Sequence, residues 1–329
     1  ITRMILKALY AVGLKDEKFY GKAKDRKTVD FLAKKKIFFT ISLVMIIGGF
    51  VCMGVNKGTS GTALNYSLDF VGGTSTNVTF NEDMDLAALD SQVVPVIEKI
   101  TKDANVQVQK VAGGNQVIFK TRTLDVEERQ ALTEALVENF GVNSDLITAE
   151  TISSTISSEM RSDAIVAVVI AAICMLLYIW FRFKDIRFAT SSVAALIHDV
   201  LVVLAFYAVA RVSVGSTFIA CMLTIVGYSI NATIVIFDRI RENLGAMTKK
   251  DDLEQLVNRS ISQTLSRSIF TSLTTFFMVA ALFVLGVSSI REFALPLMVG
   301  IVCGTYSSVC ITGALWYVLR TKIGTKKNK

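Results

Sequence analysis

Long apolar stretches alternate with charged stretches along the chain, and this pattern sets the class of protein. A helix needs roughly 18 to 25 apolar residues to cross a bilayer. Six charge-poor runs reach that length, at residues 37–55, 164–181, 188–210, 212–237, 268–290 and 293–319. Buried helices of a soluble protein would be shorter and would carry polar faces. The pattern therefore predicts an α-helical polytopic membrane protein with six transmembrane helices.

A polar region of mixed periodicity, residues 56–161, separates the first run from the second. In chain order we expect a strand at 74–80, a helix at 86–100, a hairpin of strands at 106–111 and 116–121, a helix at 124–140 and a strand at 146–152. This βαββαβ order predicts an α+β ferredoxin-like domain. The region has no cysteine and no histidine, so it offers no disulfide and no metal-ligand spacing, and a packed core must stabilise it.

The positive charges predict the orientation. If residues 1–36 are cytoplasmic, 24 of the 35 Lys and Arg residues fall on the inner side, and the short outer loops hold only Arg211 and Arg291. The positive-inside rule then places both termini in the cytoplasm and residues 56–161 outside. The expected divisions are the end of a preceding helix and a cytoplasmic linker at 1–36, a first transmembrane helix at 37–55, the outer domain at 56–161, five more helices at 162–320 and a basic tail at 321–329.

The net charge of +7 is explained by this topology and gives no reason to expect nucleic acid as a partner. The run Lys34, Lys35 and Lys36 is most simply an anchor to anionic membrane lipids. The sequence shows no nucleophile and base pair, no metal-ligand set and no phosphate-binding loop. We therefore expect neither an enzyme nor a cofactor or metal.

Polar residues inside the apolar runs are the best candidates for function. His198 and Asp199 lie roughly 15 Å from the inner end of the third run, at 1.5 Å per residue. Ionisable groups at that depth are costly and usually line a pathway or pair with one another. His198 shares a helical stripe with Ser191 and Ala195, so we expect this stripe to meet other protein. A structural polar pair that only fixes helix packing is the alternative interpretation.

Two further polar stripes follow, on the fourth and fifth runs. The fourth places Thr224, Tyr228, Asn231 and Asp238 at helical spacing, and the fifth begins at Arg267 and continues with four hydroxyl residues, Ser268, Thr271, Thr274 and Thr275. Three polar stripes in one bundle predict a hydrated seam, whereas isolated hydroxyls would only bond to their own helix. In the sixth run Gly300, Gly304 and Ser308 are four apart, a spacing typical of close helix packing.

Several segments resemble one family. They are LDFVGGT (68–74), HDV (198–200), GYSINATIVIFDRIREN (227–243), SISQTLSRSIFTSLTT (260–275) and GTYSS (304–308). These segments, in this order, are similar to SecF, the second half of the SecDF protein-export factor in the resistance-nodulation-division superfamily. The resemblance runs from about Lys34 to Leu319. Residues 1–33 resemble the end of a SecD half, so we expect the chain to be the C-terminal half of a fused SecDF.

The resemblance implies a function and partners that composition does not supply. A SecF-like half in the bacterial cytoplasmic membrane would work with a SecD half at the SecYEG translocon. It would use the transmembrane ion gradient to promote preprotein translocation after the step driven by SecA, which would be an indirect partner. A translocon scaffold without coupling and a lipid or small-molecule exporter of the same superfamily are the alternatives.

One position departs from the family pattern. In the family, the asparagine of the GYSxN segment, here Asn231, is normally followed by an aspartate that is thought to carry the coupling proton, and this chain has Ala232 there. The family's arginine on the next helix matches Arg267. We therefore expect another acid to serve Arg267, from among Asp238, Asp199 and the missing half. The coupling-site candidates are Arg267, Asp238, Asp199, His198, Asn231 and Tyr228, and the coupling ion, proton or sodium, stays open.

The LDFVGGT segment is the second candidate site. It contains Asp69, Phe70, Gly72, Gly73 and Thr74, and it follows the first transmembrane helix closely. Two adjacent glycines permit positive φ. We expect a tight turn here that couples the first helix to the outer domain, with a plain domain-entry turn as the alternative.

Overall fold

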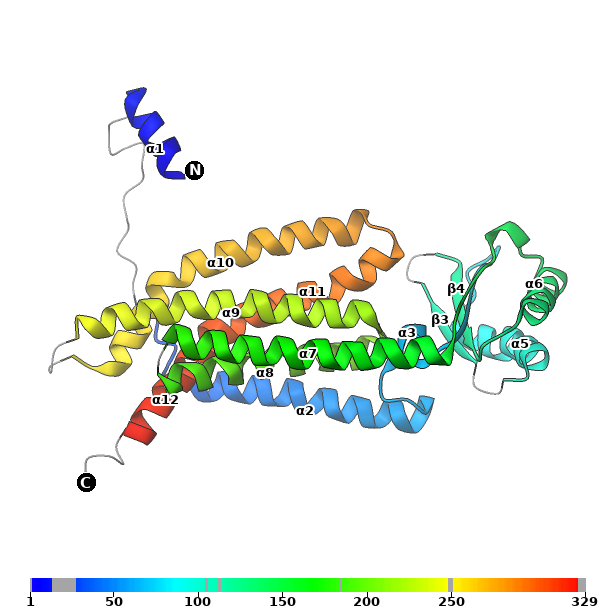
Figure 1. Cartoon of the computed structure of the whole chain (residues 1–329), viewed down its shortest axis with the longest axis horizontal. Coiled ribbons are helices and arrows are strands. Elements are labelled where there is room, and N and C mark those ends of the chain that lie inside the picture. Colours follow the sequence, from blue (N-terminus) through cyan, green and yellow to red (C-terminus); the bar gives the residue numbers. More distant parts are fainter. Residues whose placement is uncertain are drawn as a thin grey trace.

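The computed structural model describes residues 2–13, 28–103, 106–111, 114–183, 185–247 and 251–324. A bundle of long helices carries a small α/β domain at one end, and the separate helix α1 (Thr2–Ala11) precedes the bundle (Figure 1). Most of the expected linker, residues 14–27, and the expected tail from residue 325 onward lie outside the described residues.

Six helical segments in the described residues are long and apolar enough to cross a membrane. Five are the single helices α2 (Lys35–Ser60), α7 (Ser154–Phe183), α8 (Ile186–Ala210), α9 (Ser216–Gly245) and α10 (Leu253–Leu285). The sixth is built from α11 (Ser288–Tyr306), the π-helical segment η4 (Ser307–Thr312) and α12 (Gly313–Gly324). The predicted six-helix membrane protein is confirmed. Both α9 and α10 extend beyond their apolar runs, toward the connection between them, because polar helical turns are stable outside the bilayer core.

The bundle has a central and a peripheral layer. In the most apolar windows of α8 and of the sixth segment, 50% and 61% of residues are buried, against 11% in α2 and 6% in α7. One apolar cluster, which includes Phe188, Phe237 and Trp316, fills the part of the bundle that is far from the outer domain. A second, which includes Tyr207 and Ala294, fills the part next to the outer domain. The exposed Val, Ile and Leu side chains of α2 and α7 are suited to lipid, which is as apolar as they are.

The outer domain has the predicted βαββαβ order. Its strands are β2 (Gly73–Thr79), β3 (Gln107–Lys110), β4 (Gln116–Thr121) and β5 (Thr148–Ile152). They pair in the order β3-β4-β2-β5, and every pair is antiparallel. The first helical segment consists of α4 (Leu86–Ala88), η2 (Leu89–Val93) and α5 (Val94–Thr101). The second is α6 (Val126–Phe140), which is followed by the short 3₁₀ helix η3 (Ser144–Leu146).

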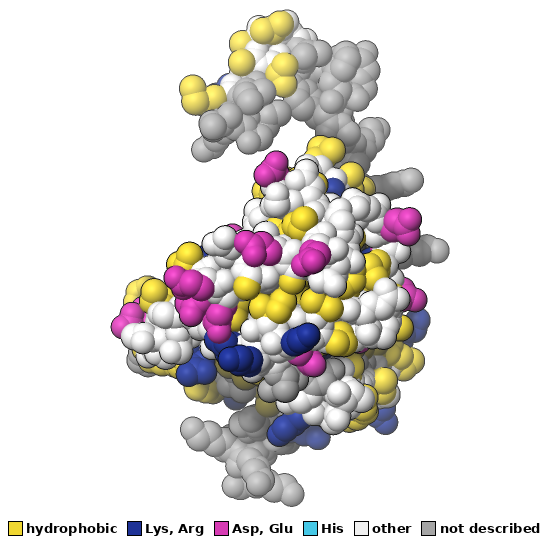
Figure 2. Space-filling view, turned by 90° about the vertical axis from the view of Figure 1, so that its right-hand side faces the viewer, with side chains coloured by type: hydrophobic (Ala, Val, Ile, Leu, Met, Phe, Trp, Pro, Cys, Tyr) yellow, Lys and Arg dark blue, Asp and Glu magenta, His cyan; other side chains and the backbone are white. Residues whose placement is uncertain are grey.

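Local signals explain these boundaries. Helix α6 begins with a capping box in which the side chains of Asp125 and Glu128 bond each other's backbone N–H groups, and it ends at Gly141, whose φ of 61° is left-handed. The core between sheet and helices contains Phe80, Phe119 and Leu132. Acidic side chains are scattered over the end of the molecule that carries this domain, as Figure 2 shows, in agreement with its excess of Asp and Glu.

Two contacts were not predicted. A two-residue strand, β1 (Asn65–Tyr66), pairs in parallel with β6 (Ser213–Val214) and joins the outer ends of α2 and α9. On the opposite side of the bundle, Asn258 of α10 accepts from the backbone N–H groups of Phe31 and Leu32 at 3.0 and 3.1 Å, and so holds the start of the first crossing in place. Segments this short have no hydrophobic period, so a sequence pattern does not reveal them.

Candidate functional site

A group of polar side chains meets around Asp199 in the interior of the bundle. Asp199 lies on α8 and is 0% exposed. Its Oδ2 accepts hydrogen bonds from Ser229 on α9 and from Ser307 of η4, the latter at 2.8 Å. Its Oδ1 lies 2.9 Å from Nδ1 of His198 and accepts from the Cys303 thiol at 3.4 Å. We call Asp199, His198, Ser229, Cys303 and Ser307 the Asp199 hub.

Small residues on three helices make this meeting geometrically feasible. On α8, Ser191 and Ala195 are buried together with His198, so the predicted contact of this stripe with other protein is confirmed. On α11, a Cβ added to Gly304 would lie 3.2 Å from the Cβ of Ser229, and one added to Gly300 would lie 2.3 Å from the Cδ1 of Ile225. The predicted close packing at these glycines is confirmed, and it brings Ser307 and Ser229 to the same carboxylate.

The helix changes its winding where it supplies Ser307. The π-helical segment η4 begins at this residue, and π-helical turns occur frequently at functional sites. The next residue, Ser308, has its Oγ 3.1 Å from the Oγ1 of Thr233 on α9. Two consecutive serines of the GTYSS segment thus both contact polar groups of the bundle interior.

The hub has an unusual charge balance. Among the residues that the structure describes, Asp199 forms no ion pair with a lysine or an arginine, and a buried carboxylate without a cation is costly. His198 Nε2 is also buried and has no hydrogen-bond partner in the described part of the chain. The one group beside Asp199 that can become positively charged is therefore His198.

A metal ion does not explain the hub well. Donor atoms of His198, Asp199 and Cys303 lie within 4.8 Å of one another, which is close enough for one ion. A zinc site with three protein ligands keeps an open position for water. Here the remaining side is occupied by the hydroxyls of Ser229 and Ser307, which already donate to Asp199. We therefore identify no metal ligands among the residues that the structure describes.

The polar stripes predicted on α9 and α10 point away from the hub. Thr224, Asn231, Arg267 and Thr271 are exposed on the surface of the bundle, and we call these four residues the open polar face. The hydroxyls of Thr224, Thr274 and Thr275 bond to carbonyl groups of their own helices. Within the described residues, most of these two stripes lie on the outside of the bundle, although Ser268 is buried, so the predicted hydrated seam between helices stays a prediction for the contact with a further helical partner.

Arg267 of α10 and Ala232 of α9 lie on the sides of these helices that carry their mutual hydrogen bonds. Gln263 of α10 accepts from Arg239 Nε at 2.6 Å and from Asn243 at 3.1 Å, which fixes how the two helices pair. Arg267 is one turn from Gln263, and Ala232 is two turns from Arg239 on the same side of α9. An aspartate at position 232 would thus lie on the same side of α9 as Arg239. Arg267 itself forms no hydrogen bond or ion pair with any described residue. Tyr228, one turn further along, is half-buried.

Asp238 is engaged elsewhere. Arg182 of α7 places its Nη2 at 2.7 and 2.6 Å from the two carboxylate oxygens of Asp238, and Arg241 lies 3.4 Å from the Oδ1. About a third of each partner's side chain is exposed, so this pair contributes little stability. The structure does not bring Asp238 or Asp199 into contact with Arg267.

The LDFVGGT segment forms a short helix, α3 (Leu68–Val71), and then the two glycines. Their φ values are 76° for Gly72 and 120° for Gly73, which confirms the predicted positive φ. Asp69 accepts from Ser216, through its backbone N–H at 2.9 Å and its hydroxyl at 2.6 Å, and so caps the start of α9. Phe70 packs against the outer apolar cluster of the bundle. The turn thus contacts α9 in addition to following the first helix.

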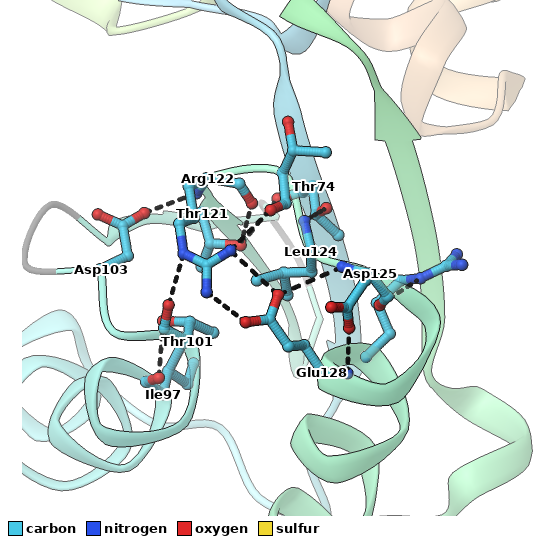
Figure 3. Close-up of polar contacts among 11 residues, drawn as sticks. Thr74, Ile97, Thr101, Asp103, Thr121, Arg122, Leu124, Asp125 and Glu128 are labelled. Atoms are coloured by element: carbon cyan, nitrogen blue, oxygen red, sulfur yellow. Dashed lines mark hydrogen bonds and ion pairs between the residues drawn. The ribbon is translucent and has the colours of Figure 1, made fainter.

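Thr74, the last residue of the segment, joins the turn to the body of the outer domain. Its Oγ1 accepts from the Leu124 N–H at 2.9 Å. Nearby, Arg122 donates to the Thr101 carbonyl at 2.7 Å and to Glu128 with both Nη atoms (Figure 3). The hydrogen bond from Arg122 holds the pKa of Glu128 below its usual value.

A polar junction that sequence reasoning missed connects the sheet to the bundle. Gln109 of β3 donates to Glu292 of α11 at 3.3 Å, and Asn65 donates to the Arg211 carbonyl at 2.9 Å. Lys120 of β4 lies 3.4 Å from the Oδ1 of Asn65. Burial lowers the pKa of Lys120, and Glu292 opposes that effect.

Sequence reasoning also missed three members of the hub, Ser229, Cys303 and Ser307. Serine and cysteine are common in membrane helices, so their presence alone carried no signal. One usable signal existed, because Ser307 belongs to the GTYSS segment and Ser229 to the GYSIN segment that carry the family resemblance.

Comparisons with known proteins agree with this architecture. The family model described as protein export membrane protein SecD/SecF, C-terminal, matches residues 132–322. The SecF protein translocase subunit of Sebaldella termitidis is 37% identical over 286 residues, which cover 87% of this chain and 90% of that protein. The SecF subunit of Calditerrivibrio nitroreducens is 35% identical, and the match covers 91% of this chain and 96% of that protein.

Solved structures give the same answer. The crystal structure of SecDF from Thermus thermophilus, whose title calls it a translocon-associated membrane protein, superposes with a TM-score of 0.82 at 31% identity. The match covers 97% of this chain and 42% of that one. SecDF in its super-membrane-facing form gives a TM-score of 0.65, also at 31% identity, and the match covers 41% of that chain. This chain therefore belongs to the SecD/SecF family of protein-export membrane proteins, as a SecF-type translocase subunit and a transport component rather than an enzyme.

Proposed function

We propose that the chain is the SecF half of a gradient-driven export factor, which works beside a SecD half and promotes preprotein translocation through SecYEG. The open polar face is the observation that carries the proposal. Exposed to hydrocarbon, the guanidinium of Arg267 and the amide of Asn231 would be costly, because lipid offers them no partner. A second helical half that covers α9 and α10 removes this cost.

The SecD half is the partner that fits the face. SecDF chains of solved structure are more than twice as long as the matched region, so they contain room for a second half. Because position 232 is alanine here, the acid that pairs with Arg267 comes from the SecD half. Movement of the coupling ion at that pair then changes how the two halves pack against each other.

The orientation completes the proposal. Both termini lie in the cytoplasm of a bacterial cell and the outer domain lies across the cytoplasmic membrane, where it meets the preprotein as it leaves SecYEG. The distribution of Lys and Arg supports this orientation. SecA acts earlier, on the cytoplasmic side, and contacts this chain only indirectly.

Ala232 favours a second candidate function, a translocon scaffold that stabilises SecYEG without coupling to the gradient. Export of a secreted reporter in cells separates the two. We expect this chain with its SecD partner to stimulate export, and the stimulation to disappear when the ion gradient is collapsed. Stimulation that survives collapse of the gradient would favour the scaffold.

Variants of Arg267 test the carrying observation directly. We expect Arg267→Ala to reduce gradient-dependent export and Ala232→Asp to alter its dependence on pH or sodium, because Ala232→Asp restores a carboxylate on α9. The variant Asn231→Cys should form crosslinks to the SecD half. Crosslinks from the outer domain should reach SecYEG. If Arg267→Lys and Arg267→Ala both export normally while the protein inserts, Arg267 only reaches the headgroups and has no role in coupling.

A further inference from the structure

We infer that Asp199 and His198 together form a proton-binding site in the interior of this chain, apart from Arg267 and Ala232. The inference deepens the proposed function and depends on it for its role in export. Proton binding itself is a separate property that can be measured without export. The starting point is that this carboxylate is fully buried and is surrounded only by neutral donors and one imidazole.

The charge of the site requires a cation. With a carboxylate and a neutral imidazole the pair carries one negative charge in the low-dielectric interior, where such a charge is unfavourable. One added proton makes the pair neutral overall. Ser229, Ser307 and Cys303 donate hydrogen bonds that keep the carboxylate in place in both states. Each donor is a hydroxyl or thiol group that can rotate.

The donor set favours a proton over sodium. Hard cations prefer several oxygen ligands, whereas Oδ1 of Asp199 faces the Nδ1 of His198 and the sulfur of Cys303. The 2.9 Å separation of Nδ1 and Oδ1 is that of a hydrogen bond along which a proton can be shared. A proton needs only this pair, and it needs no change in the packing of the helices.

Proton uptake involves His198 and Asp199. A proton from water adds to Nε2 of neutral His198, which is the buried nitrogen without a partner. The imidazole then carries hydrogen on both nitrogens, and the Nδ1 hydrogen lies between Nδ1 and the Asp199 carboxylate. Release reverses the step by loss of the Nε2 proton to water, and no bond other than N–H or O–H forms or breaks.

Tyr306 lies between the surroundings of His198 and the first turns of α2. The rings of His198 and Tyr306 have centroids 6.3 Å apart. The Tyr306 hydroxyl donates to the Phe38 carbonyl at 2.8 Å and lies 3.4 Å from the Ser42 hydroxyl, and both of these partners belong to the first turns of α2. Tyr306 therefore lies beside the imidazole of His198 and also contacts α2.

Few other titratable groups face the pair. From α11 they are Cys303 and Tyr306, with Cys310 of η4 next to Tyr306. From α9 the hub receives the hydroxyl of Ser229, which does not titrate, and on α2 the thiol of Cys52 bonds to the Ala208 carbonyl instead. Among the described residues, Asp199 and His198 are therefore the groups between which an added proton would be shared.

The single histidine of the chain makes the binding test specific. The chain is labelled with ¹⁵N-histidine and reconstituted in lipid nanodiscs with an unlabelled SecD partner. The two imidazole nitrogens are then followed by NMR between about pH 4 and about pH 9, a range that includes the one in which histidine ordinarily changes charge. We expect both signals to move with pH, a different titration in Asp199→Asn, and no response to exchange of Na⁺ for K⁺ or to a chelator. A shift caused by Na⁺ or by the chelator, signals that ignore pH, or an unchanged titration in Asp199→Asn would overturn the inference.

Export then tests the role of the site. We expect Asp199→Asn to reduce the gradient-dependent part of export at least tenfold, and the matched exposed control Asp90→Asn to leave it unchanged. Two milder variants show that a loss is not caused by misfolding, since His198→Gln keeps a hydrogen-bond donor and Tyr306→Phe keeps the ring. Both should insert normally and lose the gradient-dependent part of export. If the unmodified chain ignores the gradient, the proposed function fails; if it responds and inserted His198→Gln responds equally, only this inference fails.

Discussion

Replacement of Gly73 by alanine perturbs the contact between the LDFVGGT turn and the outer sheet at a defined point. Gly73 is the first residue of β2 and has a φ of 120°, which residues with a side chain rarely adopt. A Cβ at this position would lie 2.3 Å from the carbonyl oxygen of Thr121. That oxygen belongs to the backbone of β4, at the end of the β2–β4 ladder, so it cannot move away as the tip of a flexible side chain could.

The size of the effect can be worked out from two contributions. A non-glycine residue held in an unfavourable φ region costs about 1–3 kcal/mol. Relief of the clash displaces Thr74 from Thr121 and weakens the buried hydrogen bond from Leu124 to Thr74, for about 1 kcal/mol more. We therefore expect Gly73→Ala to destabilise the sheet by about 3 kcal/mol, which corresponds to an opening that is roughly a hundredfold more frequent.

Native-state amide hydrogen exchange in nanodiscs measures this opening. The amides of β2 and β4 should exchange roughly a hundredfold faster in Gly73→Ala, while those of the membrane helices stay unchanged. Gly114→Ala is the matched control, because the nearest atom to an added Cβ there is 4.0 Å away. An increase below about threefold in Gly73→Ala would refute the reasoning from φ and the Thr121 contact.

Three further expectations concern other parts of the chain. Asp69→Asn removes the negative charge at the start of α9 while keeping one acceptor, so exchange of the first amides of α9 should quicken by a factor that corresponds to about 1 kcal/mol, and exposed Asp145→Asn should have no such effect. Arg122→Gln should lower the thermal unfolding midpoint of the outer domain near neutral pH. Because the folded-state pKa of Glu128 lies below its ordinary value of 4.5, the part of the difference that comes from the Glu128 contact should persist above pH 4.5 and vanish as the pH falls through the lower folded-state pKa, while the part from the Thr101 carbonyl remains; a difference that stays constant with pH would contradict it. Membrane-impermeant labelling should reach a cysteine at Asp145 only from outside and one at Ala246 only from inside, and the opposite pattern would reverse the proposed orientation.

The sequence alone was sufficient for the membrane class, the six crossings and the order of elements in the outer domain. Length and apolar content decide whether a helix can cross a bilayer, and both are local properties. The outer domain faces water, so its strands alternate between apolar and polar residues and show which side is buried. The positive φ of Gly72 and Gly73 was also predictable, since adjacent glycines in a turn favour it.

The tertiary structure decided which polar groups meet. In water an apolar stripe marks the buried side of a helix, but in a membrane the lipid-facing side is equally apolar, so the pattern does not tell inside from outside. Asn231 and Ser229 are only two residues apart on α9, yet Asn231 faces outward and Ser229 bonds to Asp199 of another helix. The pairing of Asp238 with Arg182 depends likewise on how α7 packs against α9. Such contacts arise from the packing of whole helices, and a polar stripe on one helix does not reveal which other helix it meets.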